Sequence, residues 1–384
     1  MKIAFLRKQY TPYGGAERYL DRLISRLMEM GHEVHMYAHR WDPPSARPAG
    51  GPRPSFHKVP VIPMPSFLEA LSFAFLSRRL LQETHYDLIH SFERTLDPDI
   101  YRAGDGCHRE WLIRRKKMDP LWRRIFHPVN PLHRTLLFLE GRLFRSPRIK
   151  RIIVPSRSGK EEIRRHYGTP EERIEVIPNG IELNRFHPKN REDFREATRR
   201  ELGIPPEAPV LLFLGSGFRR KGLDSVIAAM PAIRRFHPAI RLVVAGKDRT
   251  DGYRIQAERR GVGESILFLG PTLKAEALYA ASDLFVLPTF YDPFSNACLE
   301  AMASGVPVLT TPYNGIADFI QNGKNGFLVE PSLEGSAIAS KVIEFFQDSG
   351  RGRMGEEARR SILALDMDAV IQQILRLYEN VQKG

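Results

Sequence analysis

The 384-residue sequence has two cysteines and no long hydrophobic segment. Two cysteines, Cys107 and Cys298, are too few for a disulfide framework and indicate a reducing compartment. The first apolar run, Ile3–Leu6, ends at Arg7 and Lys8, whereas the hydrophobic region of a signal peptide needs about 7–15 residues. No apolar run approaches the roughly 20 residues of a membrane-spanning helix. We therefore expect a cytoplasmic protein that a membrane surface could still recruit.

Charge is abundant but uneven. The formal net charge is +13, and residues 108–151 hold thirteen Lys or Arg against three Asp or Glu. Such a segment suits nucleic acid, anionic lipid or an anionic substrate. A solvent-exposed basic face with no ligand would have the same composition, so charge alone decides nothing.

The first half of the chain alternates apolar runs with amphipathic stretches. This alternation predicts a parallel sheet with helices on both faces. Ser66 and Glu69 have the spacing of a capping box, in which each side chain accepts from the other residue's amide at a helix start. The expected strands are Lys2–Leu6, Glu33–Ala38, Asp87–Ser91 and Ile100–Ala103.

The second half repeats the pattern, so we expect an α/β fold of two doubly wound, Rossmann-like domains. Each such sheet binds its ligand beyond the carboxyl ends of its strands, and two sheets set face to face would share one cleft. The predicted domains are residues 1–185, which contain the basic segment 108–145, and residues 186–365. A last helix, 366–384, could pack back on the first domain.

The most informative segment is Leu287–Pro307, where a strand ends, a loop carries Asp292 and a helix begins near Phe294. Glu300 would lie two turns into that helix. Free amides and the helix dipole at a helix start suit a diphosphate. The candidate amides belong to Ser295, Asn296 and Ala297. Alternatively, the two carboxylates are ordinary loop and helix-surface acids.

Two glycine-containing turns are further candidates. Gly215–Gly222 joins a strand to a helix and carries Ser216, Arg220 and Lys221; glycine lets the backbone approach phosphate, and cations neutralise it. Gly14 and Gly15 stand at the start of the first expected helix. Either turn could equally be a surface feature.

Together these segments resemble the family-four retaining glycosyltransferases, which have the GT-B fold. The likeness extends over nearly the whole chain and is strongest to lipopolysaccharide core glucosyltransferases of the WaaG type. The resemblance implies that Asp292 contacts the donor sugar and Glu300 the ribose, although the family has Glu at the first position. It implies that Lys221 and Arg220 hold the leaving diphosphate, and that Asp105 is a catalytic carboxylate.

The resemblance implies transfer of a hexose, with retention, from a nucleotide-diphosphate sugar such as UDP-glucose to a lipopolysaccharide core or similar glycolipid. Transfer to another polysaccharide, or sugar-nucleotide epimerisation, remain alternatives. We expect no cofactor and no metal, and Asp97-Pro98-Asp99 matches the metal motif of the other glycosyltransferase fold by chance. We expect no nucleic-acid partner, because the charge is confined to one segment.

The basic segment would then serve the membrane. Asp119-Pro120 predicts a helix with Trp122 and Phe126 on one face, beside Leu121 and Ile125. Asn130-Pro131 predicts another, with an apolar stripe of Leu132, Leu136, Leu139 and Leu143. Such faces, flanked by Arg and Lys, suit the inner surface of the cytoplasmic membrane. The leucine stripe could instead pack on the domain core.

Overall fold

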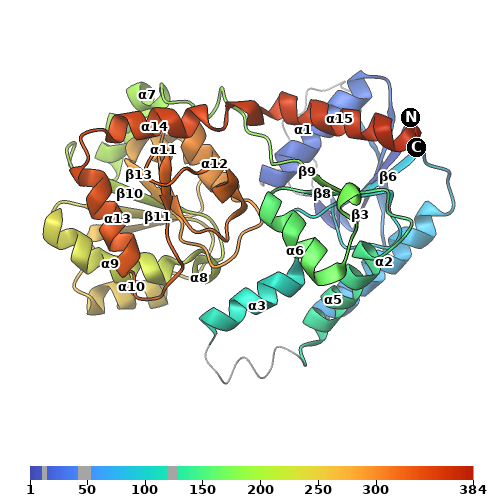
Figure 1. The fold of residues 1–384 in the computed structure, drawn as a ribbon, viewed down its shortest axis with the longest axis horizontal. Helices are drawn as coiled ribbons and strands as arrows, with labels where there is room; N and C mark the ends of the chain where they lie inside the picture. Colours follow the sequence, from blue (N-terminus) through green and yellow to red (C-terminus); the bar gives the residue numbers. More distant parts are fainter. Residues whose placement is uncertain (11–14, 42–52, 120–128, 384) are drawn as a thin grey trace. The chain divides into compact units, whose positions relative to one another are not determined.

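The computed structural model describes residues 1–10, 15–41, 53–119 and 129–383. It divides into two compact units, Met1–Gly180 with Met367–Gly384, and Ile181–Asp366. Each unit has a parallel sheet flanked by helices (Figure 1). The α/β class expected from the alternating pattern is therefore confirmed.

The first unit contains a seven-stranded sheet in the order β5-β3-β1-β6-β7-β8-β9. All neighbouring pairs in this sheet are parallel. Two short strands, β2 (Gln9–Tyr10) and β4 (Arg40–Trp41), pair separately. The seven strands are β1 (Lys2–Leu6), β3 (Glu33–Ala38), β5 (Ser55–Lys58), β6 (Leu88–Ser91), β7 (Ile100–Arg102), β8 (Arg151–Val154) and β9 (Ile174–Val176).

Alternate residues of the first unit's strands enter different apolar cores. Ile3 and Phe5 of β1 belong to a cluster with helices α1 and α15, whereas Ala4 and Leu6 pack with Phe73 of α2. This is the two-residue period of a strand covered on both faces. The described helices of this unit are α1 (Gly15–Glu29), α2 (Ser66–Leu81), α3 (His108–Met118), α5 (Pro131–Phe144), α6 (Arg157–Tyr167), the 3₁₀ turn η1 (Glu171–Arg173) and α15 (Met367–Lys383).

Two helix starts test the capping predictions. The Asn130 side chain caps α5, accepting from the amides of Leu132 and His133 at 3.0 and 3.3 Å, as expected. The capping box at Ser66 is wrong. Pro65 occupies the N-cap position of α2 and no side chain caps this helix, because Ser66 is already helical.

The second unit has a six-stranded sheet in the order β12-β11-β10-β13-β14-β15, again parallel throughout. Its strands are β10 (Val210–Leu214), β11 (Arg241–Ala245), β12 (Ile266–Gly270), β13 (Leu284–Val286), β14 (Val308–Thr310) and β15 (Gly326–Leu328). Its helices are α7 (Asn190–Glu201), α8 (Phe218–Lys221), α9 (Leu223–Phe236), α10 (Asp251–Arg259), η2 (Gly263–Ser265), α11 (Ala275–Ala281), α12 (Asn296–Ala303), η3 (Gly315–Phe319), α13 (Ser336–Gln347), α14 (Arg351–Arg360) and η4 (Leu363–Leu365).

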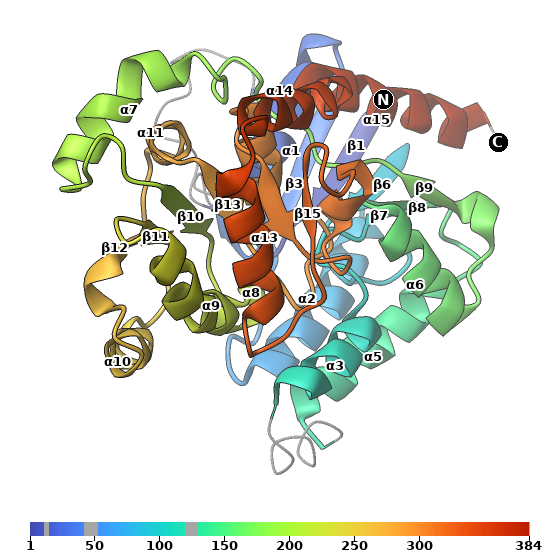
Figure 2. The same cartoon turned by 60° about the vertical axis from the view of Figure 1, so that its left-hand side comes forward.

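One continuous apolar core unites the second unit. Helices α9 and α13 lie side by side against its sheet (Figure 2), and their buried faces include Val226, Met230 and Val342. Burial of each such side chain contributes about 1.5–3 kcal/mol. This rigid core holds the loops at the carboxyl ends of β10 and β13.

Candidate functional site

The strand order of the second unit reverses between β10 and β13. The chain builds β10, β11 and β12 toward one edge and then returns to add β13, β14 and β15 on the other side. Connections leaving the carboxyl ends of β10 and β13 therefore diverge there, which is where open α/β sheets bind ligands. The turn at Gly215–Gly217 follows β10, and the loop carrying Asp292 follows β13.

Glycines allow two turns to touch at this point. Gly215 and Gly246 follow neighbouring strands with φ of 149° and 141°. A Cβ on Gly246 would lie 1.8 Å from the Gly215 carbonyl oxygen, so no side chain fits there. The Lys247 amide donates to the exposed Ser216 hydroxyl at 3.3 Å. Ser216 and Gly217 are exposed, so the tip of this turn is the part that a phosphate could reach.

The predicted cations and the predicted sugar-binding acid lie together. Lys221 Nζ is 3.2 Å and Arg220 Nη1 3.4 Å from Asp292 Oδ2. Burial alone would raise the pKa of Asp292, but these two cations outweigh it and hold the pKa below its ordinary value. Asp292 is therefore ionised, and it fixes both cations at the switch point.

Backbone contacts lock this arrangement. The Arg220 carbonyl oxygen accepts from the Phe290 amide at 2.9 Å and from the Thr289 hydroxyl at 3.1 Å. The Arg220 guanidinium donates to the Tyr291 carbonyl at 2.6 Å. The cation-bearing turn and the acid-bearing loop are thus one preorganised structure, as electrostatic stabilisation of a reacting group requires.

Helix α12 begins near Phe294 as expected, but its first amides are partly occupied. The N-cap is Ser295, and its hydroxyl accepts from Cys298 N at 3.4 Å. The Ser295 amide is not free, because it donates to Asn314 Oδ1 at 3.1 Å. Asn314 is distant in the sequence, so no local pattern could have indicated this contact.

The other predicted residues of this segment line the same region. The Phe294 amide donates to Asp292 Oδ1 at 3.3 Å, and the buried Phe294 ring contacts Phe319 edge-on. Asn296 and Ala297 form the first turn of α12. Tyr279, from α11, donates its hydroxyl to the Ala297 carbonyl at 2.9 Å.

Glu300 is a buried carboxyl group. It is 9% exposed, and its Oε2 accepts from the Tyr279 hydroxyl at 3.0 Å. Burial raises the pKa of Glu300 to about 7, although the Tyr279 hydrogen bond opposes the rise. A carboxyl group that is costly to ionise in the empty protein suits a site where ligand hydroxyl groups later donate to it.

The first unit carries the remaining predicted residues. Gly14 lies outside the described residues, and Gly15 is the first residue of α1, which follows β1 at the switch point of this sheet. Asp105 follows β7, its side chain is 61% exposed, and Arg94 Nη1 lies 3.7 Å from its carboxylate. Asp105 belongs to a different unit from Lys221 and Asp292.

Sequence reasoning missed the network behind Asp105. Glu140 is fully buried, and Arg94 Nε donates to its Oε1 at 3.0 Å. The same carboxylate accepts from the His108 amide at 2.6 Å and the Tyr167 hydroxyl at 2.7 Å. Arg94 therefore links a buried acid to an exposed one and limits where Asp105 can lie. Glu140 lies in a leucine-rich helix, and a polar residue on that stripe was the only available signal.

His108 is a buried imidazole next to the Arg94–Glu140 network. Burial, with the Arg94 cation nearby, lowers the pKa of His108 to about 3, and its Nε2 lies 3.1 Å from His133 Nδ1. The neighbouring Cys107 thiol is also buried, which raises its pKa to about 12. At neutral pH the Cys107 thiol is therefore protonated, and the His108 imidazole is uncharged and a weak base.

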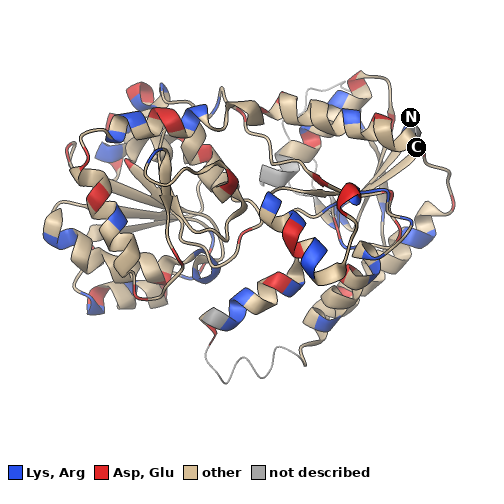
Figure 3. Ribbon diagram, in the orientation of Figure 1, with Lys and Arg blue, Asp and Glu red and all other residues tan. Residues whose placement is uncertain are grey.

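The basic segment is only partly as expected. Lys and Arg lie along α3 and α5 (Figure 3). The leucine stripe is only partly buried. Leu139 and Leu143 are each 1% exposed, the first packing against α2 and the second against the sheet, whereas Leu132 and Leu136 are half-buried. Leu121, Trp122, Ile125, Phe126 and the expected start at Pro120 lie outside the described residues.

The described residues contain neither a membrane-spanning helix nor a metal-binding cluster. Within residues 1–10, 15–41, 53–119 and 129–383, no helix has the length and apolar character needed to cross a membrane. In that same part of the chain, no three His, Cys, Asp or Glu side chains are grouped to hold a metal ion. Asp97 and Asp99 instead pair with cations, Asp97 with Arg78 and Arg148, and Asp99 with Lys150.

Two family models match this chain, one for most of each unit. Residues 13–185 match the model described as Glycosyltransferase Family 4. Residues 194–361 match the model described as Glycosyl transferases group 1. The two matches fall on the two units separately, so each half is similar to its own family domain.

Individual relatives cover nearly the whole chain. An uncharacterised glycosyltransferase of Methanocaldococcus jannaschii is 30% identical over 91% of this chain and 90% of its own. The lipopolysaccharide glucosyltransferase WaaG of Escherichia coli is 27% identical over 86% of this chain and 85% of its own. A crystal structure of WaaG, a glycosyltransferase involved in lipopolysaccharide biosynthesis, has a TM-score of 0.82 at 26% identity and covers 98% of this chain and 99% of its own.

Proposed function

Because the chain belongs to the glycosyltransferases and has their GT-B fold, we propose that it transfers a hexose, with retention, from UDP-glucose to a phosphorylated lipopolysaccharide core or similar glycolipid. The observation that carries the proposal is the convergence of Lys221, Arg220 and Asp292 at the switch point of the second unit. This is a preorganised cation pair beside glycine turns, with a buried carboxylate nearby.

In this proposal the donor diphosphate lies against the glycine turn, where Lys221 and Arg220 stabilise the negative charge that develops on it. The bond between the anomeric carbon and the phosphate oxygen breaks, and its electron pair leaves with UDP. The acceptor hydroxyl attacks from the same face, and its proton passes to the departing phosphate oxygen. A new bond joins the acceptor oxygen to the anomeric carbon.

The two acids have different tasks. Asp292 is ionised and holds both cations through Oδ2; its Oδ1 accepts from the Phe294 amide and can accept a second hydrogen bond from a hydroxyl of the donor sugar. Glu300 lies deeper and accepts from the two ribose hydroxyl groups, which favours its charged form when the donor binds. Ser216, Asn296 and Ala297 contribute polar backbone and side-chain groups around the nucleotide.

The first unit contributes the acceptor side. Gly15 lies at its switch point, with Gly14 before it in the sequence as a further candidate. Asp105, positioned by Arg94, is a carboxylate that stabilises the reacting sugar. We propose that residues 108–145 attract the anionic inner face of the cytoplasmic membrane. The buried leucines leave this attraction to the Arg and Lys side chains and to exposed apolar groups such as Ile113, which is 45% exposed.

A donor screen tests the proposal. Thermal stability and UDP release are measured with UDP-glucose, UDP-galactose, UDP-N-acetylglucosamine and GDP-mannose, without acceptor. Stabilisation by UDP, with slow release of UDP from one sugar nucleotide, is the expected result. No stabilisation of folded protein by any nucleotide would overturn the donor assignment, and conversion of one UDP-sugar into another without UDP release would identify an epimerase.

Two variants that each remove one cation, one inside the proposed site and one outside it, test where the reaction takes place. Lys221→Ala is expected to reduce UDP release about 100-fold or more, because one oxyanion-stabilising group contributes about that much to turnover. Arg235→Ala removes an exposed cation from α9, outside the site, and should leave the rate unchanged. Equal rates in the two variants would refute the assigned site.

A further inference from the structure

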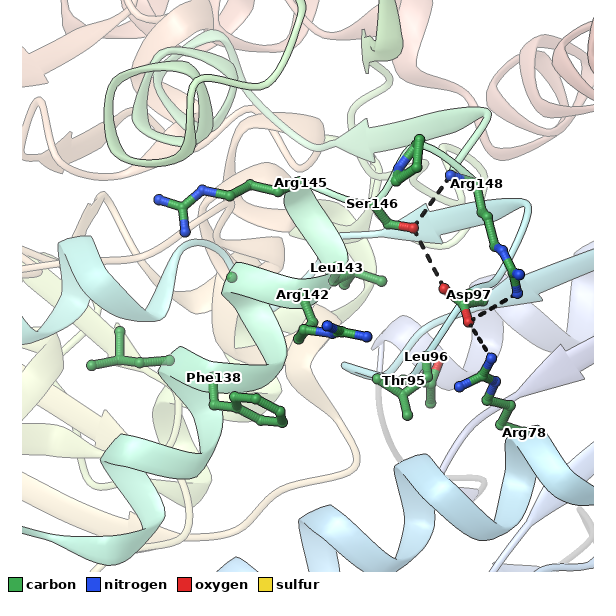
Figure 4. A pocket seen from close by; sticks show the side chains of 13 residues that line it. Arg78, Thr95, Leu96, Asp97, Phe138, Arg142, Leu143, Arg145, Ser146 and Arg148 are labelled. Atoms are coloured by element: carbon green, nitrogen blue, oxygen red, sulfur yellow. Dashed lines mark hydrogen bonds and ion pairs between the residues drawn. The ribbon is translucent and has the colours of Figure 1, made fainter.

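A second concave surface, of about 670 Å³, lies in the first unit and plays no part in the proposed reaction (Figure 4). Its wall is formed by the last turns of α2 and α5 and by the segments 95–97 and 146–148. Asp97 precedes β7, and Arg148 precedes β8. Because these strands are parallel, the pocket lies at their amino ends, whereas Asp105 follows the carboxyl end of β7.

The pocket is strongly cationic. Arg78, Arg142, Arg145 and Arg148 line it, and Asp97 is its single acidic residue. Among the described residues, Arg142 has no hydrogen-bond or ion-pair partner, and its side chain points toward Asp97 in Figure 4. Arg78 and Arg148 share the Asp97 carboxylate, so the charge of Arg142 beside them is not compensated, and an added anion would reduce the repulsion among the three cations.

Asp97 holds two of these arginines in place. Its Oδ2 is 3.0 Å from Arg78 and 3.4 Å from Arg148, and its Oδ1 accepts from the Ser146 hydroxyl at 3.4 Å. Asp97 is the one non-glycine residue in the described ranges with a positive φ, 52°. A backbone conformation that most residues avoid thus places the carboxylate where both guanidinium groups converge.

The arginines remain available to a ligand. Arg148 is 67% exposed, and exposed ion pairs of this kind are weak. Arg145 instead lies over the Tyr167 ring at 5.5 Å and points away from Asp97 (Figure 4). Arg78, Arg142 and Arg148 are therefore the groups that can close on one anion, and guanidinium groups match phosphate oxygens in pairs.

One wall is apolar. Phe138 is 51% exposed and lies on α5 beside Leu137, next to the cations. A ring of this kind packs against the face of a sugar or against the first carbons of a lipid. The ligand class is thus a phosphate group attached to a less polar body.

We infer that this pocket binds a phosphomonoester, on a sugar or on a lipid headgroup, at the edge of the sheet opposite Asp105. The site does not depend on the donor assignment. Arg78, Arg142 and Arg148 bind the phosphate, Asp97 holds Arg78 and Arg148 in place, and Phe138 contacts the body that carries the phosphate.

The test measures binding in full-length protein carrying Lys221→Gln, which weakens phosphate binding at the proposed donor site. Glucose 6-phosphate and glucuronic acid are titrated calorimetrically, and vesicles of phosphatidylcholine with and without phosphatidic acid are co-sedimented. Arg142→Gln and Arg148→Gln are each expected to weaken phosphate binding at least tenfold. Arg79→Gln removes an exposed charge from α2, outside the pocket and outside residues 108–145, and should change binding less than twofold.

The two arms distinguish the source of the phosphate. Binding of glucose 6-phosphate alone supports a soluble sugar phosphate. Binding of phosphatidic acid vesicles alone, weakened by Arg142→Gln and not by Arg79→Gln, supports a headgroup. Failure of both ligands, equal binding of glucuronic acid, or equal losses in Arg79→Gln and Arg142→Gln would overturn the inference. Circular dichroism confirms that each variant is folded, and UDP binding by protein with native Lys221 tests the donor site separately.

Discussion

Replacing Glu300 with Gln should stabilise the empty protein while weakening donor binding. The buried carboxyl group has a pKa of about 7 against an ordinary value of 4.5. The contribution of Glu300 to stability is therefore greatest below pH 4.5 and is lost as the pH rises through 7, because ionisation of this group is costlier in the folded state. The difference between 4.5 and 7 corresponds to about 3 kcal/mol, since one pKa unit is about 1.4 kcal/mol.

Gln does not titrate, so the variant does not lose stability between pH 4.5 and pH 7 as the wild type does through Glu300. The stability of Glu300→Gln relative to wild type should rise by about 2 kcal/mol between pH 5.5 and pH 8, where most of the linkage lies. The Tyr279 hydroxyl can still donate to the Gln carbonyl, so no buried donor is left without a partner. Affinity for UDP should fall by about tenfold or more, because the amide accepts less strongly than a carboxylate.

The sequence offers a way to measure each unit. All three tryptophans, Trp41, Trp111 and Trp122, belong to the first unit, and residues 181–366 contain none. In urea titrations at pH 5.5, 7 and 8, far-ultraviolet circular dichroism reports both units, and tryptophan fluorescence reports the first. The substitution should move the dichroism transition and leave the fluorescence transition unchanged.

Two results would refute this reasoning. A stability gain that is the same at pH 5.5 and pH 8 would show that Glu300 does not titrate in this range. An equal shift of the fluorescence transition would show that the effect is not local to the second unit.

Three further outcomes are expected. UDP binding at pH 6 should release close to one proton, because ribose hydroxyl groups favour the ionised form of Glu300; calorimetry in two buffers of different ionisation enthalpy measures it, and zero release would contradict the assignment. Arg94→Gln should destabilise the first unit by about 3–5 kcal/mol, since Glu140 loses its buried partner; a change below about 1 kcal/mol in the fluorescence transition would argue against the network. Gly246→Ala should cost at least about 2 kcal/mol, because its methyl group meets the Gly215 carbonyl; an unchanged dichroism midpoint would contradict the close approach.

Local patterns predicted much of this architecture. The apolar runs at Lys2–Leu6 and Glu33–Ala38 are β1 and β3, since buried strands of a parallel sheet have continuous hydrophobic sequences. The cap at Asn130 was also predictable, because it involves neighbouring residues. At Ser66 the same reasoning failed, since Pro65 fits the N-cap conformation and moves the helix start one residue earlier.

Contacts between distant segments could not be predicted in this way. Lys221 and Asp292 lie 71 residues apart in the chain, and only the strand order brings them within 3.2 Å. The stripe containing Leu139 has the same spacing whether it covers a sheet or meets lipid, so periodicity does not identify its partner. The buried Glu140 network has no local signature either.

Helix α15 has a consequence for synthesis on the ribosome. Its apolar residues, including Val370, Ile374 and Tyr378, fill the core of the first unit, and the Tyr378 hydroxyl is 2.5 Å from His90 Nδ1. Domains generally fold as their residues emerge. Here the second unit, continuous from Ile181 to Asp366, is complete before the helix that finishes the first unit has been made. The first unit is therefore translated first but completes its core last. Its apolar residues around Ile3 and Leu23 stay uncovered by α15 until nearly the whole chain has been synthesised.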